Sequence, residues 1–136
     1  MASEVKLCFI IMPFSSTTEG HTKEYWTSWW KFLKKRIEEI QKIEVRRSEA
    51  LRGDIVKEII RDLYTADVVV ADLTDMNPNV YWELGVRQSL KNGTVTIAEK
   101  REHVASDMGM KGVLRYHPKN SVKNEEFVSI FKKGNY

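Results

Sequence analysis

The stretch ADVVVADLTDMNPNVYWELG, residues 66–85, decides the fold of this chain of 136 residues. Its valine-rich first part is a continuous apolar run, which predicts a β-strand buried on both faces. A polar loop follows, and Asn77-Pro78 predicts a helix start, because asparagine caps helices and proline fits their first turn. Two carboxylates, those of Asp72 and Glu83, bracket the loop. Since ligands of open α/β sheets bind at the carboxyl ends of the strands, we expect the functional site here.

Strand and helix patterns alternate along the whole chain. Strands are expected at residues 5–12, 43–47, 67–73, 94–98 and 112–116, and helices at 22–42, 54–64, 77–91 and 124–132. The alternation predicts an α/β fold, a five-stranded and mostly parallel sheet with helices on both faces, because parallel strands need crossover helices. We expect the flavodoxin-like (Rossmann-like) strand order 2-1-3-4-5. The loops after the first and third strands would then face each other across one cleft.

Apolar residues at helical spacing predict which helix faces are buried. In the first helix they are Trp26, Trp29 or Trp30, Leu33, Ile37 and Ile40, and in the second Ile55, Ile59, Ile60 and Leu63. The tryptophans are also candidates for stacking on a nucleobase, but their spacing favours core packing or a subunit contact.

Length and composition bound the class of protein. The length predicts a single domain over residues 1–136, large enough to bury about two-thirds of its unfolded surface. The net charge of +3 is too small to indicate nucleic-acid binding by itself. The apolar run at residues 7–14 is too short to cross a membrane and lacks signal-peptide flanks, so we expect a cytoplasmic protein.

Cysteine and histidine usage gives no sign of a disulfide or a metal site. The single cysteine, Cys8, lies in an apolar strand and is expected to be an inert core thiol. No Cys/His cluster has metal-ligand spacing, so no metal is expected. His21, His103 and His117 are scattered along the chain and support neither a metal site nor a catalytic triad.

Three segments carry a resemblance to a known family: FIIMPFS at residues 9–15, ADVVVADLT at 66–74 and NPNVYWELG at 77–85. With them the chain resembles the nucleoside 2-deoxyribosyltransferase family, including its relatives the deoxynucleoside-monophosphate N-hydrolases. It is also similar, more distantly, to the bacterial TIR-like domains that cleave NAD. The resemblance spans residues 9–116 and is most specific within the last two segments.

The resemblance implies roles for individual residues. Glu83, the glutamate of the Glu-Leu-Gly motif, would be the nucleophile, and Asp72 would help to hold or protonate the base. A homo-oligomer is expected by resemblance only. The first loop would lie near the sugar or phosphate, through Pro13, Phe14, Ser15 and Ser16.

Two loops depart from the family pattern. Met12-Pro13-Phe14-Ser15 stands where the transferases have a glycine-containing loop, and Asn77-Pro78-Asn79 replaces their common Asp-Gly pair. These departures affect the inferred identity of the acceptor and of the sugar more than they affect the inferred type of bond that is cleaved.

The residues also support this chemistry without the family. Cleavage of an N-glycosidic bond passes through an oxocarbenium-like state, which an ionised carboxylate stabilises or captures. A second carboxyl group or a hydrogen-bond donor helps the base to depart. Asn77 and Asn79 are candidates for hydrogen bonds to sugar hydroxyls. Tyr81 offers aromatic surface, although helical geometry keeps Tyr81 and its neighbour Trp82 from both entering the cleft with Glu83.

Each site residue also has an ordinary structural explanation. Glu83 can be a solvated helix charge, Asp72 can accept backbone N–H groups at the strand end, and Asn77 can act only as a cap. Three functions therefore stay open. The first is cleavage or transfer at the N-glycosidic bond of a nucleoside or nucleotide. The second is TIR-like NAD hydrolysis in bacterial defence or signalling, with NAD as substrate and no cofactor. The third is a non-catalytic module that binds a nucleotide or a protein partner.

Overall fold

Strands and helices alternate along the part of the chain that the computed structural model describes, which comprises residues 6–13, 21–40, 42–47, 55–99 and 113–116. The strands are β1 (Lys6–Ile11), β2 (Ile43–Arg47), β3 (Val68–Asp72), β4 (Thr94–Ala98) and β5 (Val113–Arg115). The helices are α1 (Lys23–Ile40), α2 (Ile55–Thr65), the 3-10 turn η1 (Thr74–Met76) and α3 (Pro78–Leu90). The helix expected at residues 124–132 lies outside the described residues.

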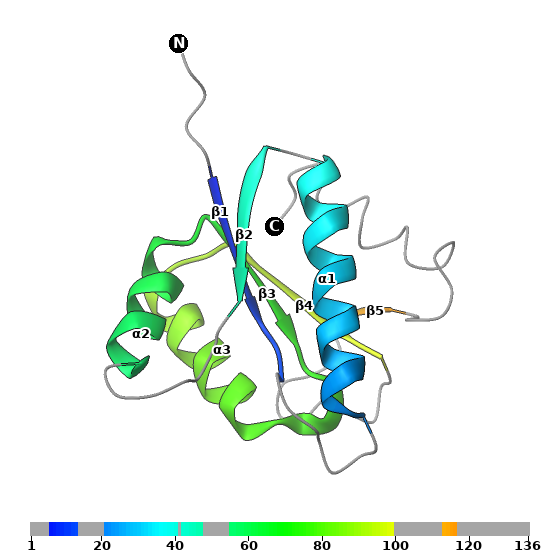
Figure 1. The fold of residues 1–136 in the computed structure, drawn as a ribbon. Coiled ribbons are helices and arrows are strands. Elements are labelled where there is room, and N and C mark those ends of the chain that lie inside the picture. Colours follow the sequence, from blue (N-terminus) through cyan, green and yellow to red (C-terminus); the bar gives the residue numbers. More distant parts are fainter. Residues whose placement is uncertain (1–5, 14–20, 41, 48–54, 100–112, 117–136) are drawn as a thin grey trace.

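The strands form one sheet in the order β2-β1-β3-β4-β5. Every neighbouring pair is parallel, so all five strands end at the same edge of the sheet. In Figure 1 this carboxyl edge lies at the bottom, where the arrowhead of β1 points. The α/β fold class and the strand order expected from the sequence are confirmed.

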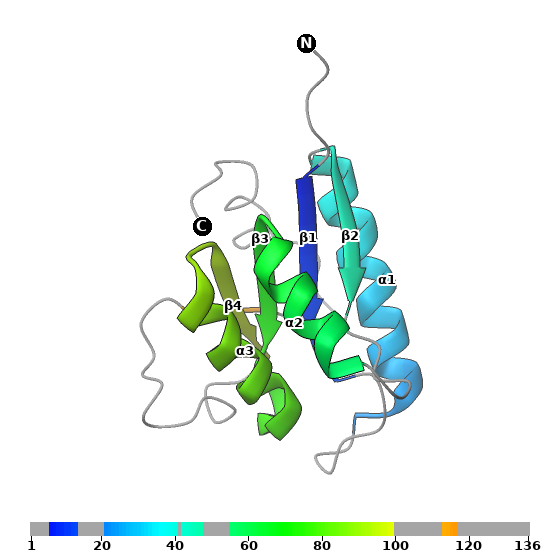
Figure 2. The same cartoon turned by 90° about the vertical axis from the view of Figure 1, so that its left-hand side faces the viewer.

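Helices cover both faces of the sheet. α1 lies on one side, and α2 and α3 lie side by side on the other (Figures 1 and 2). Because side chains alternate across a strand, β3 contributes Val68 and Val70 to the core under α1, and Val69 and Ala71 to the core under α2 and α3. Asp72 continues this alternation, which directs its side chain to the α1 face.

Most of the predicted helix faces are confirmed. Trp26, Trp29, Leu33 and Ile37 of α1 are buried, as are Ile59 and Leu63 of α2. The expectation for Ile60 is wrong, because its side chain is 40% exposed. Ile60 falls one turn from both Val56 and Tyr64, so it belongs to an apolar strip on the exposed side of α2. The side chains of Ile40 and Ile55 lie outside the described part of the structure.

Cys8 lies in the middle of β1 and is buried beneath α1. Burial raises the pKa of its thiol to about 12, so the thiolate is scarce at neutral pH. The expected inert core thiol is confirmed. Within the described residues, no helix is both long and apolar enough to cross a membrane.

A buried guanidinium on α3 links α2, β3 and β4 by hydrogen bonds at the amino edge of the sheet. Arg87, near the end of α3, is fully buried, and its guanidinium donates hydrogen bonds to backbone carbonyl oxygens at 2.7–3.4 Å. These acceptors terminate α2, lead into β3 and form the turn before β4. They belong to Leu63, Ala66, Asp67, Asn92 and Gly93.

Candidate functional site

Asp72 is the centre of a buried hydrogen-bond network at the carboxyl edge. Its Oδ1 accepts the backbone N–H of Thr74 at 3.0 Å. Its Oδ2 accepts the indole N–H of Trp29 at 3.0 Å and the hydroxyl of Tyr116 at 2.8 Å. The carboxyl group therefore links β3 to α1 and to the residue that follows β5.

The environment of Asp72 changes its acidity. Burial raises its pKa to about 6, while the hydrogen bonds from Thr74, Tyr116 and Trp29 favour the ionised form and limit the rise. The side chain has no exposed surface, and both oxygens accept bonds from protein donors. The backbone bond to Thr74 is the structural role that the sequence left open. Direct contact between Asp72 and a base stays a prediction.

Two hydroxyl groups extend this network. Thr74 Oγ1 and the Tyr116 hydroxyl lie 2.8 Å apart, and Thr74 Oγ1 also accepts the backbone N–H of Glu99 at 3.0 Å. The ring of Tyr116 stacks on Trp29, with centroids 4.3 Å apart. The network thus holds the ends of β3 and β4 together with the residue after β5.

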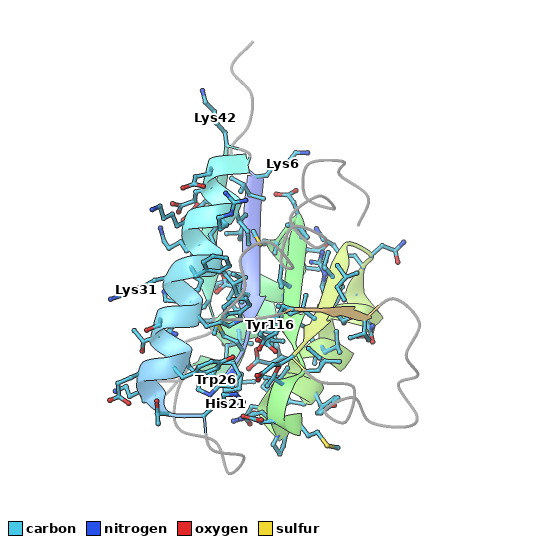
Figure 3. The ribbon with its side chains drawn as sticks, turned by 90° about the vertical axis from the view of Figure 1, so that its right-hand side faces the viewer. Lys6, His21, Trp26, Lys31, Lys42 and Tyr116 are labelled. Atoms are coloured by element: carbon cyan, nitrogen blue, oxygen red, sulfur yellow. The ribbon has the colours of Figure 1, made fainter. Side chains whose placement is uncertain are left out.

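His21 lies between two carboxylates at the same edge. Its Nδ1 is 2.6 Å from Asp75 Oδ2, and its Nε2 is 2.8 Å from Glu99 Oε2. Figure 3 shows His21 beside Trp26, at the start of α1. Sequence spacing did not indicate these contacts of His21, because the edge of the sheet brings together residues that are distant in sequence.

The other two histidines, His103 and His117, lie outside the described residues. Among the residues that the structure does describe, no group of three or more His, Cys, Asp or Glu side chains could hold a metal ion.

The η1 turn between Asp72 and α3 has an unusual backbone. Asp75 and Met76 adopt φ angles of 66° and 51°, although neither is glycine. For such residues the left-handed region costs about 1–2 kcal/mol each. The surrounding contacts must over-determine this conformation, and the bond between His21 and Asp75 is one of them.

Asn77 begins α3 and caps it. Its Oδ1 accepts the backbone N–H groups of Asn79 at 2.9 Å and Val80 at 3.3 Å, and Pro78 follows in the first turn. The predicted cap is therefore confirmed. Asn79 is exposed, and Tyr81 is half-buried against the core under α2 and α3. Contacts of Asn77, Asn79 and Tyr81 with a substrate stay predictions.

Glu83 lies in the second turn of α3 and is only 5% exposed. It is therefore not the solvated helix charge that the sequence alone allowed. Glu83 belongs to a helix on one face of the sheet, whereas Asp72 points to the other face. The two acids approach the carboxyl edge from opposite sides of β3, and their convergence on one substrate stays a prediction. Pro13, after β1, is buried, and Phe14, Ser15 and Ser16 lie outside the described residues.

Comparison with known proteins identifies the fold. A solved 2-desoxiribosyltransferase from Leishmania mexicana superposes with a TM-score of 0.63, over 96% of this chain and 99% of that chain. The chain has a nucleoside 2-deoxyribosyltransferase-like fold. Sequence identity to that structure is 15%, so the similarity concerns the fold alone. No family model and no curated protein matches the sequence.

The 2-deoxyribosyltransferase-like fold explains why sequence reasoning missed part of the site. Thr74 and Asp75 are buried and polar next to the motif, and this pattern was visible in the sequence. Trp29 was assigned to the core, and its N–H bond to Asp72 carries no sequence signal. Glu99 and Tyr116 reach the site because β4 ends beside β3 and β5 ends beside β4, which only the sheet order reveals.

Proposed function

We propose that this protein cleaves or transfers at the N-glycosidic bond of a nucleoside or nucleotide, with Glu83 as the nucleophile. The observation that carries this proposal is the burial of the Glu83 side chain in a helix that starts at the carboxyl edge of the sheet. Buried glutamates are rare and unfavourable unless they have partners or a function. The deoxyribosyltransferase-like fold supports this choice of chemistry.

In the proposed reaction the Glu83 carboxylate attacks the anomeric carbon. A C–O bond forms as the C–N bond breaks, and the electron pair of that bond goes to the departing base, which takes a proton. Water or a second base then attacks the same carbon, releases the carboxylate and restores the enzyme. The N-terminal half of α3 favours the anionic form of Glu83, with an effect that fades beyond the first turn.

Asp72 assists the departure of the base in this proposal. A carboxyl group whose pKa is about 6 exchanges its proton near neutral pH, which suits a general acid or base. Because the side chain is buried, Asp72 acts through the Tyr116 hydroxyl or after a local rearrangement that exposes it.

A substrate panel tests the proposal. Deoxynucleosides, deoxynucleoside monophosphates and NAD are incubated with the protein, and free base or nicotinamide is measured by chromatography. Glu83→Gln preserves the shape and removes the nucleophile, so base release should fall by about a thousandfold or more. Glu58→Gln, an exposed position on α2, is the matched control and should retain full activity.

The outcomes separate the three functions. Release of free base that depends on Glu83 supports the proposal, and a second base in the reaction distinguishes transfer from hydrolysis. Nicotinamide release from NAD alone would assign the NAD hydrolase instead. Binding of a nucleotide without turnover would identify a non-catalytic module. Unchanged base release by Glu83→Gln would overturn the assigned nucleophile.

The family resemblance also leads us to propose a homo-oligomer, and we propose the cytoplasm as its location from the apolar run at residues 7–14, which lacks signal-peptide flanks. Sedimentation equilibrium at several protein concentrations measures the assembly state. A monomer at all concentrations would contradict the first part, and fractionation of expressing cells tests the second.

A further inference from the structure

His21 joins three elements at the carboxyl edge of the sheet. It precedes α1, its Nδ1 contacts Asp75 in η1, and its Nε2 contacts Glu99 at the end of β4. The ring also packs against Tyr25 of α1, with centroids 4.3 Å apart. The side chains of His21, Asp75 and Glu99 are 17%, 0% and 21% exposed, so these contacts are largely shielded from water. Electrostatic contacts that are shielded from water are screened less than exposed ones.

His21 contacts η1, a turn in which the described backbone is strained. Asp75 and Met76 are consecutive left-handed residues, and Asn77 caps α3 immediately afterwards. Any relaxation of η1 would move the first turn of α3. Glu83 lies one turn further along that helix, so its position depends on the geometry of η1.

We infer that His21 is a positioning residue, which holds η1 through Asp75 and Glu99 and thereby fixes the start of the helix that carries Glu83. We call the three side chains His21, Asp75 and Glu99 the edge clamp. Its effect on a reaction rests on the proposed function of Glu83, whereas its effect on η1 does not.

The imidazole ring of His21 has two nitrogens, and each lies beside one carboxylate of the edge clamp. The titratable groups that face His21 are Asp75 from η1, Glu99 from β4 and Tyr25 from α1. Tyr25 in turn lies near Tyr116 and near the carboxylates of Asp72, Asp75 and Glu99.

A double-mutant cycle measures the clamp without any substrate. His21→Gln, Asp75→Asn and the double variant are unfolded in urea. Asparagine at position 75 tolerates the left-handed backbone, so it tests the contact rather than the turn. We expect the His21–Asp75 coupling to change the folding equilibrium constant at least fivefold.

The exposed pair Lys34 and Glu38 on α1 provides the control cycle. Such a pair, one helical turn apart in solvent, should give a coupling of about twofold or less. A His21–Asp75 coupling no larger than this control would overturn the clamp.

Hydrogen exchange then tests whether the clamp positions α3. In His21→Gln, amides of residues 74–84 should exchange at least tenfold faster, while those of residues 55–65 in α2 keep their rates. Faster exchange throughout the chain would show global destabilisation instead and would overturn the positioning role. No change in residues 74–84 would also overturn it.

Activity provides a separate readout. If Glu83-dependent base release is found, His21→Gln should lower kcat at least tenfold with little change in KM, because a misplaced nucleophile affects the transition state rather than binding. An unchanged kcat would overturn the positioning role. If no substrate is turned over but local exchange rises as expected, the proposed function fails and the edge clamp stands.

Discussion

The two edges of the sheet bury charged side chains in different ways. At the amino edge, the Arg87 guanidinium donates its hydrogen bonds to backbone carbonyls, and these oxygens neither titrate nor move independently of the chain. At the carboxyl edge, Asp72 accepts two of its three bonds from the side chains of Trp29 and Tyr116, and its own pKa is shifted toward neutrality.

The comparison distinguishes a buried charge that stabilises the fold from a buried acid of the kind found at functional sites. A guanidinium that satisfies backbone carbonyls fixes where helices and strands end, and it keeps its charge at every relevant pH. A buried carboxyl with a raised pKa gains and loses a proton, as groups at functional sites often do. The left-handed backbone at Asp75 and Met76 also lies at the carboxyl edge. Strain and perturbed acidity therefore coincide where the motif predicts chemistry.

The largest effect is expected from Arg87→Lys at the amino edge. A lysine amino group has its three N–H donors on a single nitrogen. It cannot reach both groups of carbonyls that the guanidinium bonds, those at the end of α2 and those before β4. Several buried carbonyls would lose their partner, so the free energy of unfolding should fall by about 3 kcal/mol. Urea denaturation measures this change.

The matched control is Arg61→Lys, an exposed position on α2. It should change the unfolding free energy by less than about 0.5 kcal/mol. Equal effects at positions 61 and 87 would show that the amino-edge contacts are not structural, and the contrast between the two edges would lose its basis.

The sequence predicted the fold well because the fold depends on repeated local patterns. The valines of β3 and the helical spacing of Trp26, Leu33 and Ile37 report burial directly, and Asn77-Pro78 marks the start of a helix. Among the described side chains, Ile60 was wrongly assigned to the core, because it has the same spacing and differs only in which side of α2 meets the sheet. Tertiary packing decides which side of α2 meets the sheet. The apolar face of α2 is wider than the part that contacts the sheet, so the sequence pattern does not show which residues at its border are buried.

The site was predictable only where it follows the chain. Asp72, Asn77 and Glu83 belong to one continuous motif, and Asn77 acts as the expected cap. His21 and Glu99 lie far apart in the sequence. They meet because the start of α1 lies beside the end of β4. Side-chain pairing across the edge of a sheet leaves no periodic trace in the sequence.

The second prediction concerns the pH dependence of stability at the carboxyl edge. Burial raises the pKa of Asp72 from its ordinary value of 3.8 to about 6, so the folded protein binds more protons than the unfolded chain between these values. This contribution to stability is full below about pH 4 and is lost as pH rises through 6, on the order of 3 kcal/mol. Urea denaturation from pH 4 to 7 measures it in the wild type.

Asp72→Asn should flatten that profile, since the amide does not titrate. It should also be less stable than the wild type at pH 4, because in either orientation its amide nitrogen cannot accept the N–H of Trp29 or of Thr74, whereas a carboxyl oxygen can even when protonated. Glu58→Gln removes an exposed acid instead and should keep the wild-type slope. An identical slope in Asp72→Asn and in the wild type would show that Asp72 does not titrate in this range.

The smallest effect is expected from the strained turn itself. Met76 is 47% exposed with a φ of 51°, so Met76→Gly relieves the left-handed backbone and removes little buried surface. Met76→Ala removes the same side chain and keeps the strain. The glycine variant should therefore be more stable than the alanine variant by about 1 kcal/mol, measured by urea denaturation. Equal stabilities would mean that position 76 stores no strain in the folded protein. A more stable glycine variant with unchanged hydrogen exchange in α3 would show that the contacts around Asp75, rather than the backbone preference of Met76, hold the helix that carries Glu83.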